Sequence, residues 1–397
     1  MSQSMFRSAV ILGLLSSVGP FAIDMYLPAM PAIGADLNAS VAAVQGTITA
    51  FFVAFGIAQL VYGPWADQSG RKPPLYLGLV IFVIATVGCA LAETIGSLTA
   101  WRFLQGLGAA VVMVIPRAII RDMHTGHEAT RLMALCMLVI SVSPMLAPLA
   151  GSGVIAVADW RGIFVVLLVA AWASLLMTGF LLPETLKPAD RVKVNLGNLL
   201  AGARVLLSDR MFLGLTFLGA FGMASFFVFI ASASFVYAGQ FGLSPAGFSI
   251  AFALNAIGFF AASQLAAGLG QRFGARVVVF RASLGFALCA SATFALAAAG
   301  FGSLPVVVAG LFLGNACLGL VIPTTMVMAL DDHGDIAGLA SSLGGTLQML
   351  TGGAVVALAG PFFDGTAVPM LAVIAICALA AFGLALAVLA RRAPVGA

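Results

Sequence analysis

Charged side chains are scarce in this sequence. Asp, Glu, Lys and Arg make up 8% of its 397 residues, whereas hydrophobic residues make up 62% and the mean hydropathy is +1.14. Soluble domains carry roughly 25% charged residues. The composition therefore excludes an ordinary soluble domain and indicates a polytopic membrane protein.

The residue types that build metal, redox and catalytic centres are also few. The five cysteines fall inside apolar runs without a Cys-x-x-Cys spacing, and the three histidines (His124, His127 and His333) lie in polar segments. The sequence contains no His-Glu-x-x-His, Gly-x-Ser-x-Gly or Walker string. We therefore expect no metal and no cofactor, and an enzyme is disfavoured. A channel is disfavoured because no symmetric polar filter is visible, and a nucleic-acid partner because no large basic patch is visible.

Long apolar runs fill the rest of the chain. A helix needs about 20 apolar residues to cross a bilayer. Breaking the sequence at charges, prolines and polar clusters gives twelve such runs, at residues 8–33, 41–63, 74–92, 97–120, 132–157, 162–182, 211–236, 246–268, 276–299, 303–329, 336–360 and 367–390. The longest polar stretch, 183–210, separates the sixth run from the seventh. The sequence predicts an all-α polytopic membrane protein with two six-helix halves, 1–182 and 211–397, joined by the linker 183–210.

The basic residues predict the orientation of these helices. With the N-terminus inside the cell, every Lys and Arg except Arg102, Arg117 and Arg161 falls in a segment on the cytoplasmic side. Cytoplasmic loops of membrane proteins carry an excess of Lys and Arg. We therefore expect both termini in the cytoplasm and 183–210 to be a cytoplasmic linker.

Asp24 and Arg102 stand out among the charges that lie within the predicted runs. Asp24 follows sixteen residues without a charge, and a carboxylate in an apolar helix costs several kcal/mol unless it is paired, protonated or facing water. It is a candidate proton site; the alternative is a solvated carboxylate at the membrane surface. Arg102 lies in the fourth run, with Gln105 one turn away on the same face. Arg102 either tunes the pKa of a nearby acid, or satisfies backbone carbonyls, or snorkels outward.

The two halves carry a weak internal repeat. Gly63-Pro-Trp-Ala-Asp67-Gln-Ser-Gly70-Arg71-Lys72 follows the second run, and a related segment that ends at Gly274 and Arg276 follows the eighth. Related six-helix halves are typical of transporters that alternate about a central site.

The Gly63–Lys72 string resembles the loop signature of the major facilitator superfamily, and the second copy has Gln271 in place of its acid. Trp101-Arg102-Phe-Leu-Gln105-Gly106-Leu-Gly108 resembles the fourth-span motif of proton-coupled members. Ala147-Pro148-Leu-Ala-Gly151-Ser152 half meets the antiporter motif Gly-Pro-x-x-Gly-Gly. Asp24-Met-Tyr-Leu-Pro28, Ile119-Ile-Arg121-Asp122 and Pro183-Glu184-Thr185 resemble the Bcr/CflA drug-resistance subfamily.

This resemblance implies a monomeric drug:proton antiporter of the bacterial inner membrane, with the proton gradient as its energy source. Its substrates would be small lipophilic compounds such as amphenicols or bicyclomycin. It implies that Asp24 is a proton site facing the central cavity. We expect Arg102 to act with Asp24 in proton coupling and Arg71 to pair with Asp122. A conformational latch would comprise Gly63, Asp67, Gly70, Arg71, Lys72 and Asp122, and a pivot in the fifth span would comprise Pro144, Pro148 and Gly151.

Substrate contacts are expected among aromatic, flexible and uncharged polar side chains inside the runs. The candidates are Asp24, Tyr26, Gln45, Thr49, Gln105, Phe221, Met223, Asn255, Asn315 and Gln348. Each uncharged polar residue could equally join helix to helix. A transporter of a small metabolite, such as a sugar or an amino acid, remains the alternative function; such a carrier more often has several cavity charges.

Overall fold

The computed structural model describes residues 3–123, 126–192 and 195–389, and that part of the chain is helical without any strand. Twelve of its helical segments are long and apolar enough to cross a membrane, one for each predicted run. The predicted all-α polytopic fold is therefore confirmed. The cytoplasmic location of the termini stays a prediction.

The chain divides into two compact units, Met1–Leu196 and Gly197–Ala397. The boundary falls inside the stretch 183–210, for which the linker role stays a prediction. Part of that stretch is helical. The helices of the first unit are α1 (Gln3–Asp24), α2 (Met30–Asp36), α3 (Val41–Ser69), α4 (Lys72–Ala90), α5 (Ile95–Ala109), α6 (Val111–Met123), α7 (Gly126–Val157) and α8 (Arg161–Phe180). Those that follow are α9 (Leu196–Ser208), α10 (Arg210–Gly239), α11 (Pro245–Phe273), α12 (Ala275–Leu296), α13 (Leu304–Leu330), α14 (Ala337–Ala359) and α15 (Ala367–Leu389).

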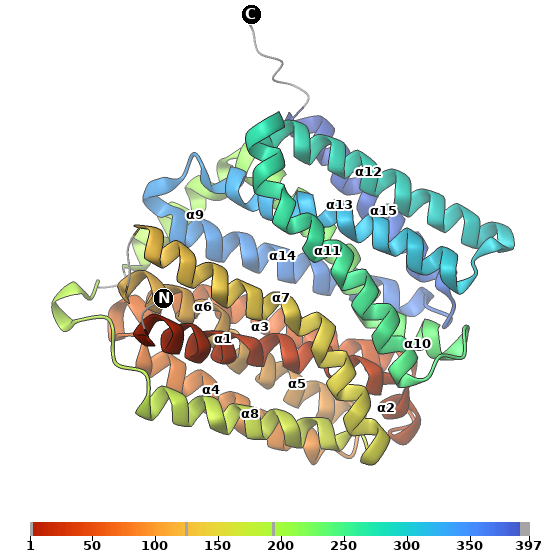
Figure 1. Ribbon diagram of the computed structural model, residues 1–397, viewed down its shortest axis with the longest axis horizontal. Coiled ribbons are helices and arrows are strands. Elements are labelled where there is room, and N and C mark those ends of the chain that lie inside the picture. The colour runs from red at the N-terminus through yellow and green to blue at the C-terminus, as the bar shows by residue number, and fades with distance from the viewer. Residues whose placement is uncertain (1–2, 124–125, 193–194, 390–397) are drawn as a thin grey trace, which may run out of the picture. The chain divides into compact units, whose positions relative to one another are not determined.

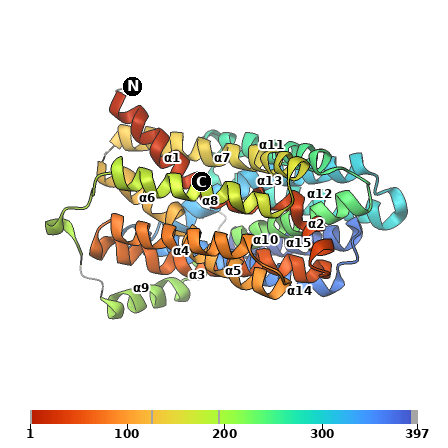
Figure 2. The same ribbon diagram turned by 90° about the horizontal axis from the view of Figure 1, so that it is seen from below.

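In the first unit, α5 packs between α3 and α4, α1 packs along α7, and α8 lies beside α4 (Figures 1 and 2). Glycines permit the closest of these approaches. A Cβ at Gly106 would overlap with the carbonyl oxygen of Phe51 on α3, and one at Gly108 would lie 2.6 Å from the carbonyl oxygen of Gly78 on α4. Small residues of this kind let membrane helices pack backbone to backbone. They fix α5, which carries Arg102, tightly against its neighbours.

A group of hydrogen bonds connects several helix ends at one end of the first unit. The carboxylate of Asp36, at the end of α2, accepts hydrogen bonds from Nε1 of Trp160 at 3.0 Å and from Nη1 of Arg161 at 2.9 Å. The second guanidinium nitrogen of Arg161 donates to the carbonyl oxygen of Ala92 at 3.0 Å. One arginine thus joins the ends of α2, α4 and α8.

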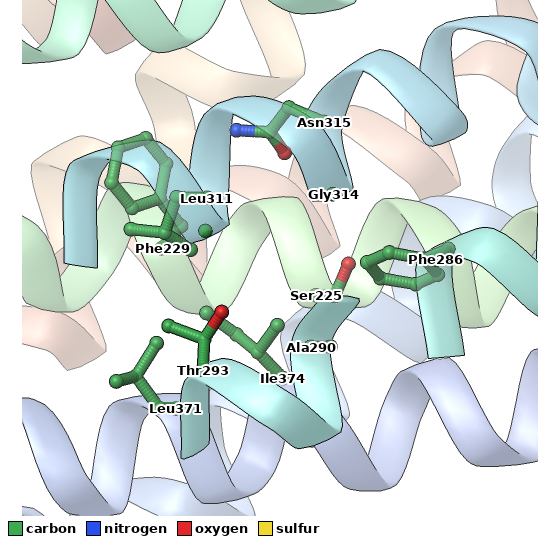
Figure 3. A pocket seen from close by; sticks show the side chains of 11 residues that line it. Ser225, Phe229, Phe286, Ala290, Thr293, Leu311, Gly314, Asn315, Leu371 and Ile374 are labelled. Atoms are coloured by element: carbon green, nitrogen blue, oxygen red, sulfur yellow. The ribbon is translucent and has the colours of Figure 1, made fainter. Parts of the chain in front are cut away.

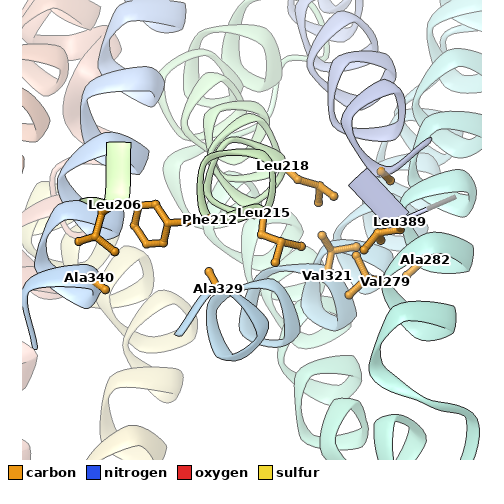
Figure 4. Close-up of a cluster of buried hydrophobic side chains, with 11 residues drawn as sticks. Leu206, Phe212, Leu215, Leu218, Val279, Ala282, Val321, Ala329, Ala340 and Leu389 are labelled. Carbon is orange, nitrogen blue, oxygen red and sulfur yellow. The ribbon is translucent and has the colours of Figure 1, made fainter. Parts of the chain in front are cut away.

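In the second unit, α10 packs against α13, α14 and α15, and α13 packs against α11 and α12. Buried apolar side chains of α10, including Phe212, Leu215 and Leu218, meet Val279 of α12 and Val321 of α13 (Figure 4). Leu206 of α9 and Ala340 of α14 belong to the same cluster. The helix within the predicted linker is therefore packed into the second unit.

Candidate functional site

The first span is broken immediately after Asp24. Helix α1 ends there, a 3₁₀ turn covers Leu27–Ala29, and α2 begins at Met30. Proline has no backbone N–H. Pro28 therefore cannot bond the carbonyl oxygen of Asp24 in helical register, and Pro31 cannot bond that of Leu27. The prolines explain why the helix ends at Asp24, in the middle of an apolar span.

Arg102 lies fully buried against this break. Its Nη1 donates to the carbonyl oxygen of Ala22 at 3.0 Å and to Oε1 of Gln105 at 2.6 Å. Its guanidinium carbon lies 4.5 Å from the ring centroids of both Tyr26 and Phe51, within cation–π range. Arg102 therefore bonds a backbone carbonyl, as one sequence interpretation held, and does not snorkel. Its Nε and Nη2 have no hydrogen-bond partner within the described residues.

A chain of hydrogen bonds with a fixed direction leads away from Arg102. Nε2 of Gln105 donates to Oγ1 of Thr86 at 2.8 Å, and the Thr86 hydroxyl donates to the carbonyl oxygen of Phe82 at 2.6 Å. Gln105 shares a face with Arg102 as predicted, whereas Thr86 was not among the predicted residues. The available signal was a hydroxyl in an otherwise apolar run.

The Tyr26 hydroxyl is also held by a hydrogen bond whose direction is fixed. Because the Thr47 hydroxyl donates to the carbonyl oxygen of Val44 at 2.6 Å, the Tyr26 hydroxyl is the donor in its 2.8 Å bond to Thr47. Thr47 was also missed from the sequence. Thr49, which was predicted as a substrate contact, donates to the carbonyl oxygen of Gln45 on its own helix, and Gln45 is itself buried.

Asp24 is 5% exposed and forms no hydrogen bond or ion pair with any residue that the structure describes, Arg102 included. It is therefore not a solvated carboxylate at the membrane surface. Burying an isolated carboxylate costs far more free energy than burying its protonated form. The arrangement can hold a proton at Asp24 while Arg102 supports the neighbouring backbone.

The residues of the loop signature gather at the junction of α3 and α4. Nε and Nη2 of Arg71 donate to the two carboxylate oxygens of Asp122 at 2.7 and 3.0 Å, and Nη1 donates to Asp67 at 2.5 Å. We call Asp67, Arg71 and Asp122 the Arg71 cluster. The expected pairing of Arg71 with Asp122 is present. Burial alone would lower the pKa of Arg71, but the two carboxylates outweigh it and hold that pKa above its ordinary value.

The other predicted latch residues have separate roles. Gly70 ends α3 with φ of +99°, a conformation that favours glycine. Lys72 begins α4, and its Nζ donates to the carbonyl oxygen of Leu182 at 2.9 Å. Gly63 lies within α3, with open space where a Cβ would stand. The latch function of the set stays a prediction.

The predicted pivot lies in α7. Pro144 and Pro148 are inside this helix, and Gly151 packs on the break in the first span. A Cβ at Gly151 would overlap with the carbonyl oxygen of Met25. The structure thus joins α7 to the turn that carries Asp24. The pivot role stays a prediction.

A small pocket, with about 10 Å³ of space for the centres of water-sized molecules, lies among α10, α12, α13 and α15 of the second unit (Figure 3). Phe229, Phe286 and other apolar groups form most of its wall. Asn315 also lines it, is 5% exposed, and has no hydrogen-bond partner for Nδ2 within the described residues. The hydroxyls of Ser225 and Thr293 donate to carbonyl oxygens of their own helices, at 2.6 and 2.7 Å. Their oxygens remain available as acceptors beside the Asn315 donor.

The other predicted substrate residues of the second unit are not part of this pocket's wall. Asn255 is fully buried on α11, and its Nδ2 donates to the carbonyl oxygen of Ala251 at 2.9 Å. Phe221 and Met223 are half-buried on α10, and Gln348 is half-buried on α14. The structure therefore brings Asn315 together with Ser225 and Thr293, neither of which the sequence analysis named. In the described part of the chain, no three His, Cys, Asp or Glu side chains are grouped to bind a metal ion.

Comparisons with known proteins agree with this architecture. The family model described as Major Facilitator Superfamily matches residues 12–357. The chain is 35% identical over 386 residues to an uncharacterized MFS-type transporter, YdgK, of Bacillus subtilis (strain 168), covering 95% of this chain and 94% of that one. It is 29% identical over 378 residues to a bicyclomycin resistance protein homolog of Haemophilus influenzae, covering 94% of each.

A shorter match joins the chain to the multidrug resistance protein MdtL of Escherichia coli O81, with 38% identity over 170 residues and 43% of each chain covered. Among solved structures, a D-xylose–proton symporter superposes with a TM-score of 0.76 over 96% of this chain and 97% of that one, at 15% identity. That likeness establishes the fold alone. The chain thus belongs to the Major Facilitator Superfamily and is a multi-pass transporter of the bacterial inner membrane, not an enzyme.

Proposed function

We propose that this transporter exports small lipophilic drugs in exchange for protons. Compounds such as amphenicols or bicyclomycin are the substrates we would examine first. Asp24 carries the proposal, because it is a buried carboxyl at a break in a membrane span and has no hydrogen-bond or ion-pair partner among the residues that the structure describes. The names of two relatives, a bicyclomycin resistance protein homolog and a multidrug resistance protein, support the drug class.

The proposed exchange uses one carboxyl for two ligands. While Asp24 is enclosed, the protonated form is favoured, because an unpaired carboxylate loses its hydration. When the site opens to water, the carboxylate gains hydration and can release the proton. A lipophilic cation or a hydroxyl-bearing neutral compound then binds in its place. Competition between proton and drug for Asp24 couples their movements in opposite directions, with the proton gradient as the energy source and a monomer as the working unit.

Arg102 acts through the backbone in this scheme. Its bond to the carbonyl oxygen of Ala22 replaces a helical bond at the break, and its stacking on Tyr26 fixes the next turn. Asp24 lies between these two anchored residues. Arg102 therefore holds the carboxyl in place without neutralising it.

The pocket lined by Asn315 is the proposed contact site for the drug in the second unit. One amide donor and two hydroxyl acceptors among aromatic walls suit a compound that carries a hydroxyl or amide on an apolar frame. A charged metabolite has no matching side chain there, because the residues that line this pocket include neither acid nor base. This observation favours a drug over a charged metabolite.

The test is energised efflux from a host without its own drug pumps, together with drug susceptibility, across amphenicols, bicyclomycin and lipophilic cations. We expect wild type to export at least one compound, a protonophore to stop export, and Asp24→Asn to abolish it at normal membrane insertion. Glu93→Gln is the matched control, because Glu93 is an exposed carboxylate in the same unit.

Export by Asp24→Asn at the wild-type rate would show that Asp24 is not the coupling acid. If no drug is exported and a sugar or amino acid is taken up or released in a proton-dependent way, the substrate is a metabolite and the proposed drug export is wrong.

A further inference from the structure

The segment after α8 folds back onto the start of α4. The carboxylate of Glu184 accepts three backbone N–H bonds: Oε1 from Arg71 at 2.9 Å and from Leu186 at 3.0 Å, and Oε2 from Lys72 at 3.0 Å. The first amide groups of a helix have no partner within the helix, and they attract negative charge. A side chain more than a hundred positions away in the sequence therefore supplies the N-terminal cap of α4.

The same segment contacts the Arg71 cluster directly. The Thr185 hydroxyl donates to Oδ2 of Asp122 at 2.8 Å, the oxygen that also accepts from Nε of Arg71 at 2.7 Å. The backbone N–H of Val192 donates to the carbonyl oxygen of Asp67 at 3.0 Å. All three members of the cluster are thus bonded to residues 184–192, through backbone at Arg71 and Asp67 and through the side chain at Asp122.

A glycine at position 70 is required for residues 184–192 to pack against the start of α4. A Cβ at Gly70 would lie 2.7 Å from Oε2 of Glu184 and 3.0 Å from Nη2 of Arg191. The positive φ of Gly70 disfavours any residue with a side chain. The nearby carboxylate of Glu184 leaves no room for one either. The glycine opens the turn so that Glu184 reaches the amides behind it.

We propose that Glu184 and Thr185 are positioning residues for the Arg71 cluster, and that docking of residues 184–192 sets the geometry in which Arg71 binds Asp122. Glu184 fixes the backbone from which the Arg71 side chain extends, and Thr185 fixes the carboxylate that receives it. Undocking this segment releases both ends of the Arg71–Asp122 pair at once. The inference rests on the proposed latch role of Arg71 and is independent of the identity of the drug.

The first experiment needs no substrate. Hydrogen–deuterium exchange of the purified full-length protein is measured in peptides covering residues 66–76 and 117–123, for wild type, Glu184→Ala, Arg71→Ala and the double variant. We expect Glu184→Ala to accelerate exchange on the order of tenfold in both peptides, because one charged acceptor holds several amides. At the end of α6, we expect the double variant to exchange no faster than Arg71→Ala alone, because Glu184 acts there through Arg71.

The second experiment measures turnover and half-saturation in the same variants with an exported compound. Glu184→Ala and Arg71→Ala should each lower kcat on the order of tenfold with KM unchanged within about twofold, and the double variant should match the single ones. Thr185→Val should lower kcat, and Thr185→Ser, which restores the hydroxyl, should recover it. A merely structural role would not produce this rescue.

Asp190→Asn is the matched control, because Asp190 is an exposed acid in the same docked segment. It should leave exchange and kcat within twofold of wild type. Thermal unfolding of every variant shows whether it has folded.

Unchanged exchange in Glu184→Ala would overturn the docking. Additive effects of Glu184→Ala and Arg71→Ala would make Glu184 an independent helix cap and overturn its positioning role. Normal kcat in Arg71→Ala would overturn the latch role on which the inference rests. Failure of wild type to export any drug contradicts the proposed function only, because the exchange experiment still decides whether Glu184 acts through Arg71.

Discussion

The guanidinium of Arg102 donates to the carbonyl oxygen of Ala22 at 3.0 Å, two residues before Asp24. Asp24 and Arg102 are therefore linked through one short piece of backbone instead of through an ion pair. This bond joins α5 to the last turn of α1, where the helix ends. A proton that binds at Asp24 and a movement of α5 would act on the same turn.

Arg102→Lys should abolish most drug export although it keeps the positive charge. The guanidinium bonds Ala22 and Gln105 and stacks on two rings, whereas an ammonium is a compact point charge without a flat face. Losing one such charged hydrogen bond costs about 1.5–3 kcal/mol, so we expect export to fall about tenfold or more. The measurement is initial efflux at equal membrane content. Arg117→Lys, in the same span, is the matched control and should retain export; equal loss in both variants would contradict the specific role of Arg102.

Gly151→Ala should destabilise the protein. Its Cβ would overlap with the carbonyl oxygen of Met25, and the backbone there has little freedom to move. Overpacking of this kind typically costs about 1–3 kcal/mol. Thermal unfolding in detergent should give a lower Tm than for wild type. Gly153→Ala, on the same helix with open space at its Cβ, should leave the Tm unchanged. Equal Tm values for both variants would show that α7 does not pack as closely on α1 as described.

Gly314→Ala should reduce drug affinity without affecting folding. Its Cβ would lie 3.5 Å from the Phe286 ring, an ordinary contact, and would occupy space in the pocket lined by Asn315. We expect KM for the exported compound to rise several-fold at unchanged Tm and kcat. Gly310→Ala, where a Cβ would overlap with the Thr293 side chain, should lower the Tm instead. Unchanged KM in Gly314→Ala would place the drug elsewhere.

Asp209 should stabilise the second unit in a pH-dependent way. Burial raises its pKa, but N–H donors at Met211 and His333 outweigh this effect and hold the pKa below its ordinary value of 3.8. A group whose pKa is lowered by folding contributes stability above its unfolded pKa and loses it as the pH falls through the folded one. Asp209→Ala, which removes the cap of α10, should cost about 1 kcal/mol at neutral pH.

The comparison is thermal unfolding of wild type and Asp209→Ala between pH 7 and pH 3. The difference in Tm should shrink as the pH drops below about 4, because the wild-type carboxylate then becomes protonated. A difference that stays constant down to pH 3 would contradict an ionic contribution of Asp209.

The twelve spans and the pairing of Arg71 with Asp122 could be predicted from the sequence. Hydropathy decides which segments cross the membrane, because every backbone polar group in lipid must be bonded within its own helix. The charges in the loop signature are few, so their possible partners are few. The latch, pivot and coupling roles built on these positions remain predictions.

The partners of the buried polar groups could not be predicted. Thr86 of α4 bonds Gln105 of α5 where Gly108 lets these two helices approach closely, and Thr47 of α3 bonds Tyr26, which follows α1. A hydroxyl inside an apolar run can bond its own helix or a neighbour, and sequence spacing does not distinguish these outcomes. The same ambiguity separates Asn255, which bonds its own helix, from Asn315, which lines a pocket.

Gly70 and Gly274 end their helices with the same kind of turn in two different chemical settings. Each ends a helix of 29 residues with a positive φ, +99° and +85°, and each donates its N–H four residues back. The residue three positions before each glycine is Asp67 in one copy and Gln271 in the other. The same bend thus occurs with an acid and without one, so the backbone geometry of the turn does not depend on the ionic cluster. An acid and a guanidinium could be transplanted into the second turn without reshaping its backbone.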